Sequence, residues 1–159
     1  MSDIVIPTCP NPKVPAPKAP LVHLTSVQLR FNDIDMLGHL NNGAYLELFD
    51  LAKTEFLTSI IGHPLDWRDA VAVIVNINCS FFAQAFYGEP LAVLTGVQSV
   101  STHSFILEQR MVNTATGAVN CIATTVMVAF DHASATSAEL TPEWREALTR
   151  ASRSTSTLV

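Results

Sequence analysis

The apolar positions of residues 43–61 repeat with the period of a helix. They recur every three or four residues, while the polar side chains gather on a different face. The apolar set comprises Tyr45, Leu48, Phe49, Ala52, Phe56 and Ile60. Additional apolar residues widen this stripe, namely Leu46, Leu51, Leu57 and Ile61. We therefore expect a helix that is buried on most sides and that stops at Gly62 and Pro64.

Five stretches with strand-like patterns accompany this helix. Each is rich in β-branched or other apolar residues, and the first alternates in part, with Leu24, Val27, Leu29 and Phe31 as its apolar set. The five are residues 21–31, 70–83, 90–101, 104–113 and 118–130. Because only short turns separate the last four, we expect antiparallel neighbours rather than crossover connections. Residues 141–150 open with Thr-Pro-Glu, which predicts a short final helix.

This order of elements predicts an α+β domain in which one long helix covers a five-stranded antiparallel sheet. We expect the domain over residues 21–132, followed by a short helix and tail over 133–159. Residues 1–20 hold six of the nine prolines, which favours an extended arm. Two interpretations of the arm are open. It is a tail without a catalytic role, or it packs across a neighbouring surface through Ile4, Val5 and Ile6.

The charge content narrows the classes of partner. Only 14% of the residues are charged, against roughly 25% in an average domain, and 48% are hydrophobic. Part of the surface is therefore expected to be buried in a homo-oligomer, which would also cover the open edges of the sheet. The net charge of −5 and the absence of a Lys/Arg cluster argue against nucleic acid.

The remaining composition indicates a cytoplasmic protein. Cys9, Cys79 and Cys121 are odd in number and far apart, which fits a reducing compartment and gives no metal-binding motif. The N-terminus lacks the pattern of a signal peptide. The longest aliphatic run, residues 70–75, is too short to span a membrane.

The polar run DIDMLGHLNN, residues 33–42, directly precedes the long helix. A helix N-terminus offers unpaired N–H groups and partial positive charge, here around Asn42 and Gly43, which can stabilise an oxyanion. Asp35 can fold back beside these groups as a nucleophile or general base. His39 can serve as a second proton-transfer group. The run thus has the parts of an acyl-transfer site.

The same run also has a purely structural interpretation. Asn41 or Asn42 can act as the N-cap of the helix, and Asp33 can be a turn residue or a partner for Arg30. Asp35 and His39 can be ordinary loop residues. Periodicity and composition do not decide between these alternatives.

The stretch RFNDIDMLGHLNNGAYLELFDLAKTEF, residues 30–56, resembles the signature of hotdog-fold acyl-CoA thioesterases of the 4-hydroxybenzoyl-CoA thioesterase type. That signature has Arg-Phe, Asp-x-Asp, Gly-His-x-Asn-Asn and then Tyr-Leu on the helix. Looser matches extend the resemblance over about residues 24–132: Phe86-Tyr87-Gly88-Glu89, Ser104-Phe105 and Val128-Ala129-Phe130-Asp131. The sequence departs from the family pattern at Glu89-Pro90 and at His103.

The resemblance implies roles for individual residues. The catalytic carboxylate of the family corresponds to Asp35, and the amide that polarises the thioester carbonyl corresponds to the helix start at about Asn42. Similarity to the Asp-x-Asn-x-His-Val-Asn-Asn motif of plant acyl-carrier-protein thioesterases implies catalysis by His39, although Leu37 replaces the asparagine of that motif. Substrate-binding candidates are Asn41, Gly43, Tyr45 and Ser104. Side chains that can shape an acyl tunnel are Phe49, Phe56, Phe81, Phe82 and Trp67.

The resemblance also implies a substrate and an assembly. We expect an acyl thioester of coenzyme A or of an acyl-carrier protein, hydrolysed without a metal or an organic cofactor by a homodimer or tetramer. Two alternatives are a hotdog hydratase or dehydratase acting on enoyl thioesters, and a non-catalytic module that binds acyl groups. The hydratases carry an Asp-x-Asn-Pro-x-His arrangement, and this loop lacks the Asn-Pro.

Overall fold

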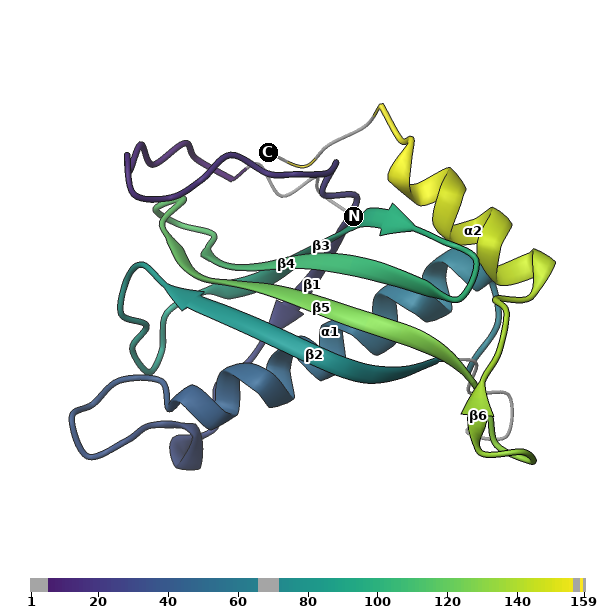
Figure 1. Cartoon of the computed structure of the whole chain (residues 1–159). Helices are drawn as coiled ribbons and strands as arrows, with labels where there is room; N and C mark the ends of the chain where they lie inside the picture. Colours follow the sequence, from purple (N-terminus) through teal and green to yellow (C-terminus); the bar gives the residue numbers. More distant parts are fainter. Residues whose placement is uncertain (1–5, 66–71, 156–157, 159) are drawn as a thin grey trace.

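The computed structural model describes residues 6–65, 72–155 and 158, so Trp67 lies outside the described residues. Two α-helices and one antiparallel sheet make up this part of the chain (Figure 1). In chain order the elements are β1 (His23–Val27), the 3₁₀ turn η1 (Phe31–Asp33), α1 (Asn42–Ile61), β2 (Ala72–Phe81), β3 (Leu91–Val100), β4 (Ser104–Asn113), β5 (Val119–Asp131), β6 (Thr136–Ser137) and α2 (Pro142–Ser152).

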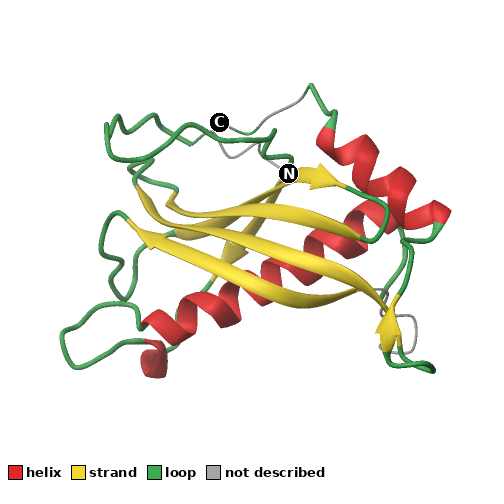
Figure 2. Cartoon of the chain, viewed as in Figure 1, coloured by secondary structure: helices red, strands yellow, loops and turns green. Residues whose placement is uncertain are grey.

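The sheet has the spatial order β1-β3-β4-β5-β2, and the two-residue strand β6 adds to β5. All strand pairs in the described part are antiparallel. Figure 2 shows α1 running across one face of this sheet. The predicted α+β class is therefore confirmed, with a sixth short strand and the expected second helix. Strands β1 and β2 form the two edges of the sheet.

One predicted connection is wrong. The short link between β2 and β3 was expected to make them neighbours, but β2 pairs with β5 and lies on the opposite side of β4 and β5 from β3. The intervening residues 82–90 cross the end of the sheet instead. Their backbone is satisfied by bonds from Phe82 N–H to Asn120 O (2.9 Å) and from Leu40 N–H to Ala85 O (2.8 Å). These contacts with distant segments replace the hairpin bonds that a short turn would normally allow.

Helix α1 is bounded by the residues that the sequence indicated. The Asn41 side chain caps its start, and Gly62 ends it in the left-handed conformation with φ of 90°. The buried side chains are Ala44, Tyr45, Leu48, Phe49, Ala52, Phe56 and Leu57. Leu46 and Leu51, however, are 41% and 49% exposed, so this chain alone does not bury the helix on most sides.

The first predicted strand also ends earlier than expected. β1 stops at Val27, and Phe31 lies on η1 with 83% of its surface exposed. The apolar alternation of residues 21–31 therefore does not continue into a single buried face.

A row of polar side chains divides the core beneath α1 into two apolar clusters. Thr95, Gln109 and Thr125 come from three adjacent strands and are each at most 2% exposed. Gln109 Nε2 donates to the main-chain carbonyl of Phe49 (2.9 Å), which ties the sheet to the middle of α1. One cluster lies toward the start of α1 and includes Leu48, Phe49, Val93, Met111 and Cys121. The other lies toward its end and includes Phe56, Leu57, Val97, Leu107 and Met127.

The proline-rich arm packs on the sheet of its own chain. It lies on the opposite side of the sheet from α1 (Figure 1), where Ile6 joins a small cluster containing Leu94 and Val112. The N–H of Lys18 donates to Glu108 Oε2 (2.9 Å), and Glu108 is in turn paired with buried Arg110 (2.7 Å). The predicted contacts of Ile4 and Val5 lie outside the described residues.

The C-terminal helix is part of the same core. Trp144 of α2 is 7% exposed, and its ring centroid lies 6.4 Å from that of Phe105 on β4. Leu148 and Ala151 join the cluster at the end of α1. The short helix expected within residues 133–159 therefore packs against the core formed by the preceding strands and α1.

Candidate active site

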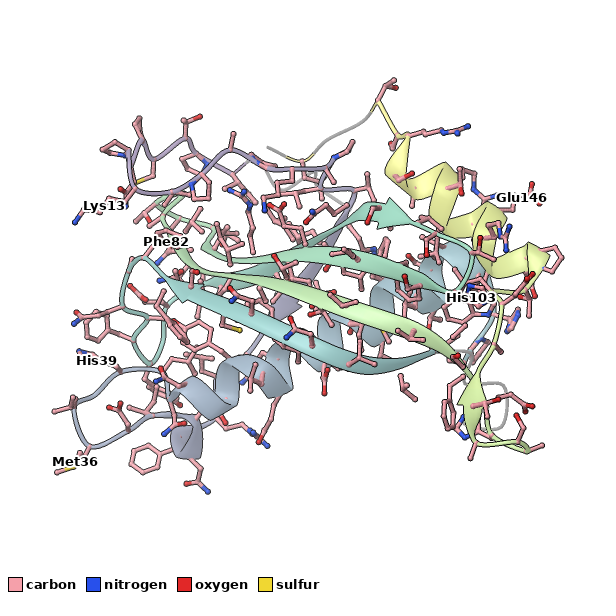
Figure 3. The ribbon with its side chains drawn as sticks, in the orientation of Figure 1. Lys13, Met36, His39, Phe82, His103 and Glu146 are labelled. Atoms are coloured by element: carbon pink, nitrogen blue, oxygen red, sulfur yellow. The ribbon has the colours of Figure 1, made fainter. Side chains whose placement is uncertain are left out.

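A cavity of about 290 Å³ opens at the N-terminus of α1. One wall comes from the loop and the first turn of the helix, and the other from the end of β2 and the residues that follow it. The first wall consists of Asp35, His39, Leu40, Asn42 and Tyr45, and the second of Phe81, Phe82, Ala83, Gln84 and Ala85. Figure 3 shows labelled His39 and Phe82 at this end of the molecule.

The loop closes on itself around Asp35. The Asp35 N–H donates to the carbonyl of His39 (2.8 Å), and Gly38 permits the turn with φ of 81°. The carboxylate oxygen Oδ1 accepts the N–H groups of Leu37 (2.8 Å) and His39 (3.2 Å). These bonds fix the side chain, while Oδ2 makes no hydrogen bond with a described residue. The half-buried carboxylate therefore has one oxygen held by two N–H groups and one without a hydrogen bond to a described residue.

The helix start leaves the N–H group of Asn42 without an acceptor in the described part of the chain, and Asn42 lines the same cavity as Asp35. Asn41 Oδ1 accepts the Gly43 N–H (2.8 Å), which confirms that Asn41 is the N-cap. A free N–H at the positive end of a 20-residue helix is suited to stabilise negative charge on an oxygen atom.

His39 stands between the loop and the far wall. Its backbone bridges to Phe86, and the two rings meet edge-on with centroids 5.3 Å apart. The imidazole makes no hydrogen bond with a described residue and is half-buried at the cavity. His39 is therefore positioned by packing, with both ring nitrogens available for proton transfer.

Asp33 is a partner of Arg30, as the structural interpretation of the polar run predicted. Its carboxylate is 4% exposed and forms an ion pair with Arg30 (2.7 Å), which also contacts Glu47 (2.9 Å). The hydrogen bond from Arg30 holds the pKa of Asp33 below its usual range. The Asp33 carbonyl accepts the Asn41 N–H (2.8 Å). Asp33 thus braces the start of the helix and does not line the cavity that contains Asp35.

Tyr45 forms the inner part of the cavity. Its side chain is 2% exposed and packs edge-on against Phe81, with ring centroids 5.3 Å apart, and beside Phe49 at 6.3 Å. The hydroxyl forms no hydrogen bond with a described residue. Burial raises the pKa of this hydroxyl, so it stays protonated across the neutral range.

Three of the expected substrate-binding residues are not brought to this cavity. Asn41 and Gly43 are bonded to each other and line a separate hollow next to Arg30 and Glu47. Ser104 begins β4 at the opposite end of the sheet, where it is hydrogen-bonded to Ser101 (2.9 Å between hydroxyl oxygens). In Figure 3 its neighbour His103 lies far from His39. Substrate contacts by these three residues stay predictions.

The second wall contains residues that no pattern in the sequence singled out. Ala83, Gln84 and Ala85 reach the cavity because residues 82–90 cross the end of the sheet and pair with the loop through Leu40. They carry no motif and no periodic signal. Phe81 and Phe82 were candidates for shaping an acyl tunnel, and the structure places both at this cavity.

Within residues 6–65, 72–155 and 158, His, Cys, Asp and Glu side chains form no group of three or more that could hold a metal ion. Neither α1 nor α2 has the length and apolar character required to cross a bilayer.

A long helix on one face of an antiparallel sheet, with a carboxylate and the first turn of the helix at the same cavity, is the arrangement of the hotdog thioester hydrolases. The sequence agrees with this class, because the model of the Thioesterase-like superfamily matches residues 29–148. The chain therefore belongs to the Thioesterase-like superfamily and is a thioester hydrolase. The match also runs past residue 132 into α2.

Individual relatives point the same way. The chain is 28% identical over 127 residues to the long-chain acyl-CoA thioesterase FadM of Escherichia coli strain K12, covering 78% of this chain and 95% of the relative. The structure of YbaW, a probable thioesterase from Escherichia coli, superposes with a TM-score of 0.69 at 26% identity, over 82% of this chain and 98% of the other.

A thioesterase from Thermus thermophilus, solved with coenzyme A and zinc, is similar in fold. Its TM-score is 0.70 at 22% identity, and the similarity covers 79% of this chain and 95% of the other. At this identity the likeness establishes the fold alone.

Proposed function

We propose that the protein hydrolyses acyl-CoA thioesters, or the same acyl groups on a carrier protein, at the N-terminus of α1. The observation that carries the proposal is the shared cavity of Asp35, His39 and Asn42. The names of the relatives support coenzyme A as the carrier. The reaction consumes only water, so it needs no organic cofactor, and coenzyme A is part of the substrate.

Asn42 and Asp35 divide the first step between them. The thioester carbonyl accepts the Asn42 N–H, which stabilises the negative charge that develops on its oxygen. Asp35 Oδ2 attacks the carbonyl carbon directly or removes a proton from the water that attacks it. A carbon–oxygen bond forms and the carbon–sulfur bond breaks, which releases the thiolate. On the direct route, water then hydrolyses the mixed anhydride and regenerates Asp35.

His39 donates the proton that the leaving sulfur needs. The leaving thiolate must be protonated if it is released as a thiol, and His39 lies at the cavity with no competing hydrogen bond to a described residue. A protonated imidazole can donate to the sulfur and then recover its proton from the attacking water or from Asp35. The products are one carboxylic acid and one thiol for each water consumed.

The test is the Asp35→Asn variant, assayed by thiol release across short, long and aromatic acyl-CoAs. Asparagine keeps the size of the side chain but removes the negative charge, so we expect kcat to fall by about 10² to 10⁴. Asp50→Asn is the matched control, because Asp50 is exposed on α1 and paired with Lys53 outside the cavity. An Asp35→Asn enzyme with the wild-type rate would refute the assignment.

An enoyl-CoA substrate separates thioester hydrolysis from hydration. Enoyl-CoA is incubated with the wild-type enzyme while thiol release and loss of the double bond are followed together. Thiol release alone is expected. Hydration without thiol release would favour the hydratase alternative, and tight binding without either reaction would favour an acyl-binding module.

The proposal includes a homodimer, with a tetramer as the larger assembly, in the cytoplasm. Edge strand β2 exposes Val73, Val75, Ile77 and Phe81, each between 36% and 57%. Pairing of β2 with its copy across a two-fold axis would satisfy the edge and cover these side chains. The three cysteines are unpaired, which supports a reducing compartment.

A further inference from the structure

Asn120 is a buried residue that the proposed reaction does not use. It lies near the start of β5, is 1% exposed and does not line the cavity. The pairing of β4 with β5 skips this residue, because Met111 pairs with Cys121 and Val112 pairs with Val119. Asn120 is therefore the extra residue of a β-bulge. Bulges turn a side chain out of the regular alternation of a strand.

Three hydrogen bonds join Asn120 to the second wall of the cavity. The Asn120 carbonyl accepts the N–H groups of Phe82 (2.9 Å) and Ala83 (3.3 Å). Its side-chain Nδ2 donates to the carbonyl of Gln84 (2.7 Å). Figure 3 labels Phe82 at this end of the sheet. Asn120 thus holds three consecutive residues of the wall from a position outside the cavity.

The loop that contains His39 holds the next part of the same segment. The Ala85 carbonyl accepts the Leu40 N–H (2.8 Å), and the backbone of His39 bridges to Phe86. Residues 82–85 belong to no helix or strand, so these bonds take the place of a regular ladder. The separation of the two walls therefore depends on Asn120 on one side and on the loop on the other.

The Asn120 side chain leaves one of its own polar atoms unsatisfied. Its Oδ1 is buried and has no hydrogen-bond partner in the described part of the chain. A buried polar atom without a partner destabilises a fold, and an apolar side chain of similar size would avoid this penalty. Packing alone would therefore favour a residue such as leucine here. The function of the amide is its bond to the Gln84 carbonyl, which fixes the middle of the wall.

We propose that Asn120 is a positioning residue that sets the wall against which the acyl group binds. It touches no reacting atom and acts through residues 82–85. An acyl group whose carbonyl is bound at Asn42 lies between the two walls, so its affinity depends on where the second wall stands. A long acyl group contacts more of this wall than an acetyl group does. This inference rests on the proposed hydrolysis at the same cavity.

The test replaces Asn120 with leucine, which has a similar volume but cannot donate to Gln84. Two ketone analogues of acyl-CoA serve as probes, S-(2-oxononyl)-CoA with a long chain and S-acetonyl-CoA with a single methyl group. A methylene separates the carbonyl from the sulfur in both, so neither is hydrolysed. Calorimetric titration of Asn120→Leu should show Kd raised about tenfold for the long analogue and less than about threefold for the short one. Thiol release from octanoyl-CoA should show a matching rise in KM, with kcat within about twofold of wild type.

Gln98→Leu is the matched control. Gln98 is the extra residue of the bulge between β3 and β4, and its Oε1 is also buried without a partner in the described chain. It follows Val97 of the cluster toward the end of α1, so its replacement should change neither Kd nor KM. Asn120→Ser is the second variant if Asn120→Leu does not fold, because the serine hydroxyl is too short to replace the amide.

The two analogues separate positioning from a general loss of stability. Partial unfolding would lower the number of binding sites and kcat for every ligand, but it would leave Kd and KM unchanged. An unchanged Kd for the long analogue, an equal rise for both analogues, or no binding of the long analogue to wild type would overturn the inference. If wild type binds the long analogue but releases no thiol from any acyl-CoA, the proposed hydrolysis fails, and the Kd values still decide the role of Asn120.

Discussion

Asp33 and Asp35 are two residues apart and have different surroundings. Asp33 is enclosed by Arg30 and by the backbone at the start of α1, so its charge is fully engaged in structure. The Asp35 carboxylate accepts hydrogen bonds from described residues through one oxygen only, and Asp35 lines the cavity. The sequence could indicate this difference because Arg30 is three residues from Asp33 and because the family motif singles out the second aspartate. The free oxygen itself could only be found from the fold of the loop.

A histidine far from the cavity makes the stability of the fold depend on pH. His23 lies on β1 with its ring against Phe56 at 5.8 Å, and its Nε2 is buried without a partner in the described chain. Burial lowers the pKa of His23 from its ordinary value of 6.5, although Glu55 opposes this shift. The unfolded chain therefore takes up a proton at a higher pH than the folded protein does.

We expect this difference to lower the free energy of unfolding as the pH falls below about 6.5. The contribution of neutral His23 is complete above that value and is lost progressively in acid. Urea unfolding at several pH values between about 5 and 8 measures it. The dependence of the free energy of unfolding on pH should be weaker in His23→Gln than in wild type. It should be unchanged in His63→Gln, because the His63 side chain is 55% exposed. If the free energy of unfolding of His23→Gln depended on pH as strongly as that of wild type, His23 would not be the cause of the pH dependence.

At the scale of elements, the sequence predicted both helices and the five long strands, but it did not predict how β2 pairs. Periodicity reports which side chains share a face, and Asn41, Gly62 and Thr141 mark helix ends through local geometry. The partner of β2 depends on contacts between residues 82–90 and segments distant in sequence, which no local pattern encodes. The exposure of Leu46 and Leu51 was not predicted either, since a helical stripe does not state what covers it.

The proline-rich arm, residues 1–20, packs closely against the sheet at Gly96. Gly96 on β3 has the Pro20 carbonyl directly above the position that a Cβ atom would occupy. Gly96→Ala would push this backbone away and disturb the junction between the arm and β1. We expect a loss of about 1–3 kcal/mol in the free energy of unfolding, measured by urea titration.

Ser99→Ala provides the comparison, because Ser99 lies exposed on the same strand and outside the cover of the arm. Its effect should stay within about 0.5 kcal/mol. Equal stability of Gly96→Ala and wild type would mean that the arm does not hold this position in solution.

For the whole molecule, β2 is the edge strand whose outer side pairs with no other strand of the described chain. The apolar side chains of β2 and of α1 remain partly exposed, although only 14% of the residues carry charge. Low charge content predicted an oligomer from composition alone. The particular edge could not be predicted, because the order of the strands was needed to show that β2 is on the outside.

Ile77→Lys should dissociate the proposed dimer. Ile77 lies on β2 and is 37% exposed, so a lysine there would place two charges against each other across the two-fold axis. Light scattering after size-exclusion chromatography should then report the 17.2 kDa of one chain, where wild type reports at least twice that mass. Ser137→Lys, on exposed β6, should keep the wild-type mass. Retention of the wild-type mass by Ile77→Lys would exclude this edge as the interface.

The polar row formed by Thr95, Gln109 and Thr125 has a consequence for how the enzyme can diverge. It separates the apolar side chains near the cavity from those that anchor α2. Substitutions in one half share few partners with the other half, so their effects on folding should add independently. The half beneath the cavity can then accept changes that suit a new acyl group while the distant half maintains the fold. Gln109, bonded to the Phe49 carbonyl, holds the helix in place as those changes accumulate.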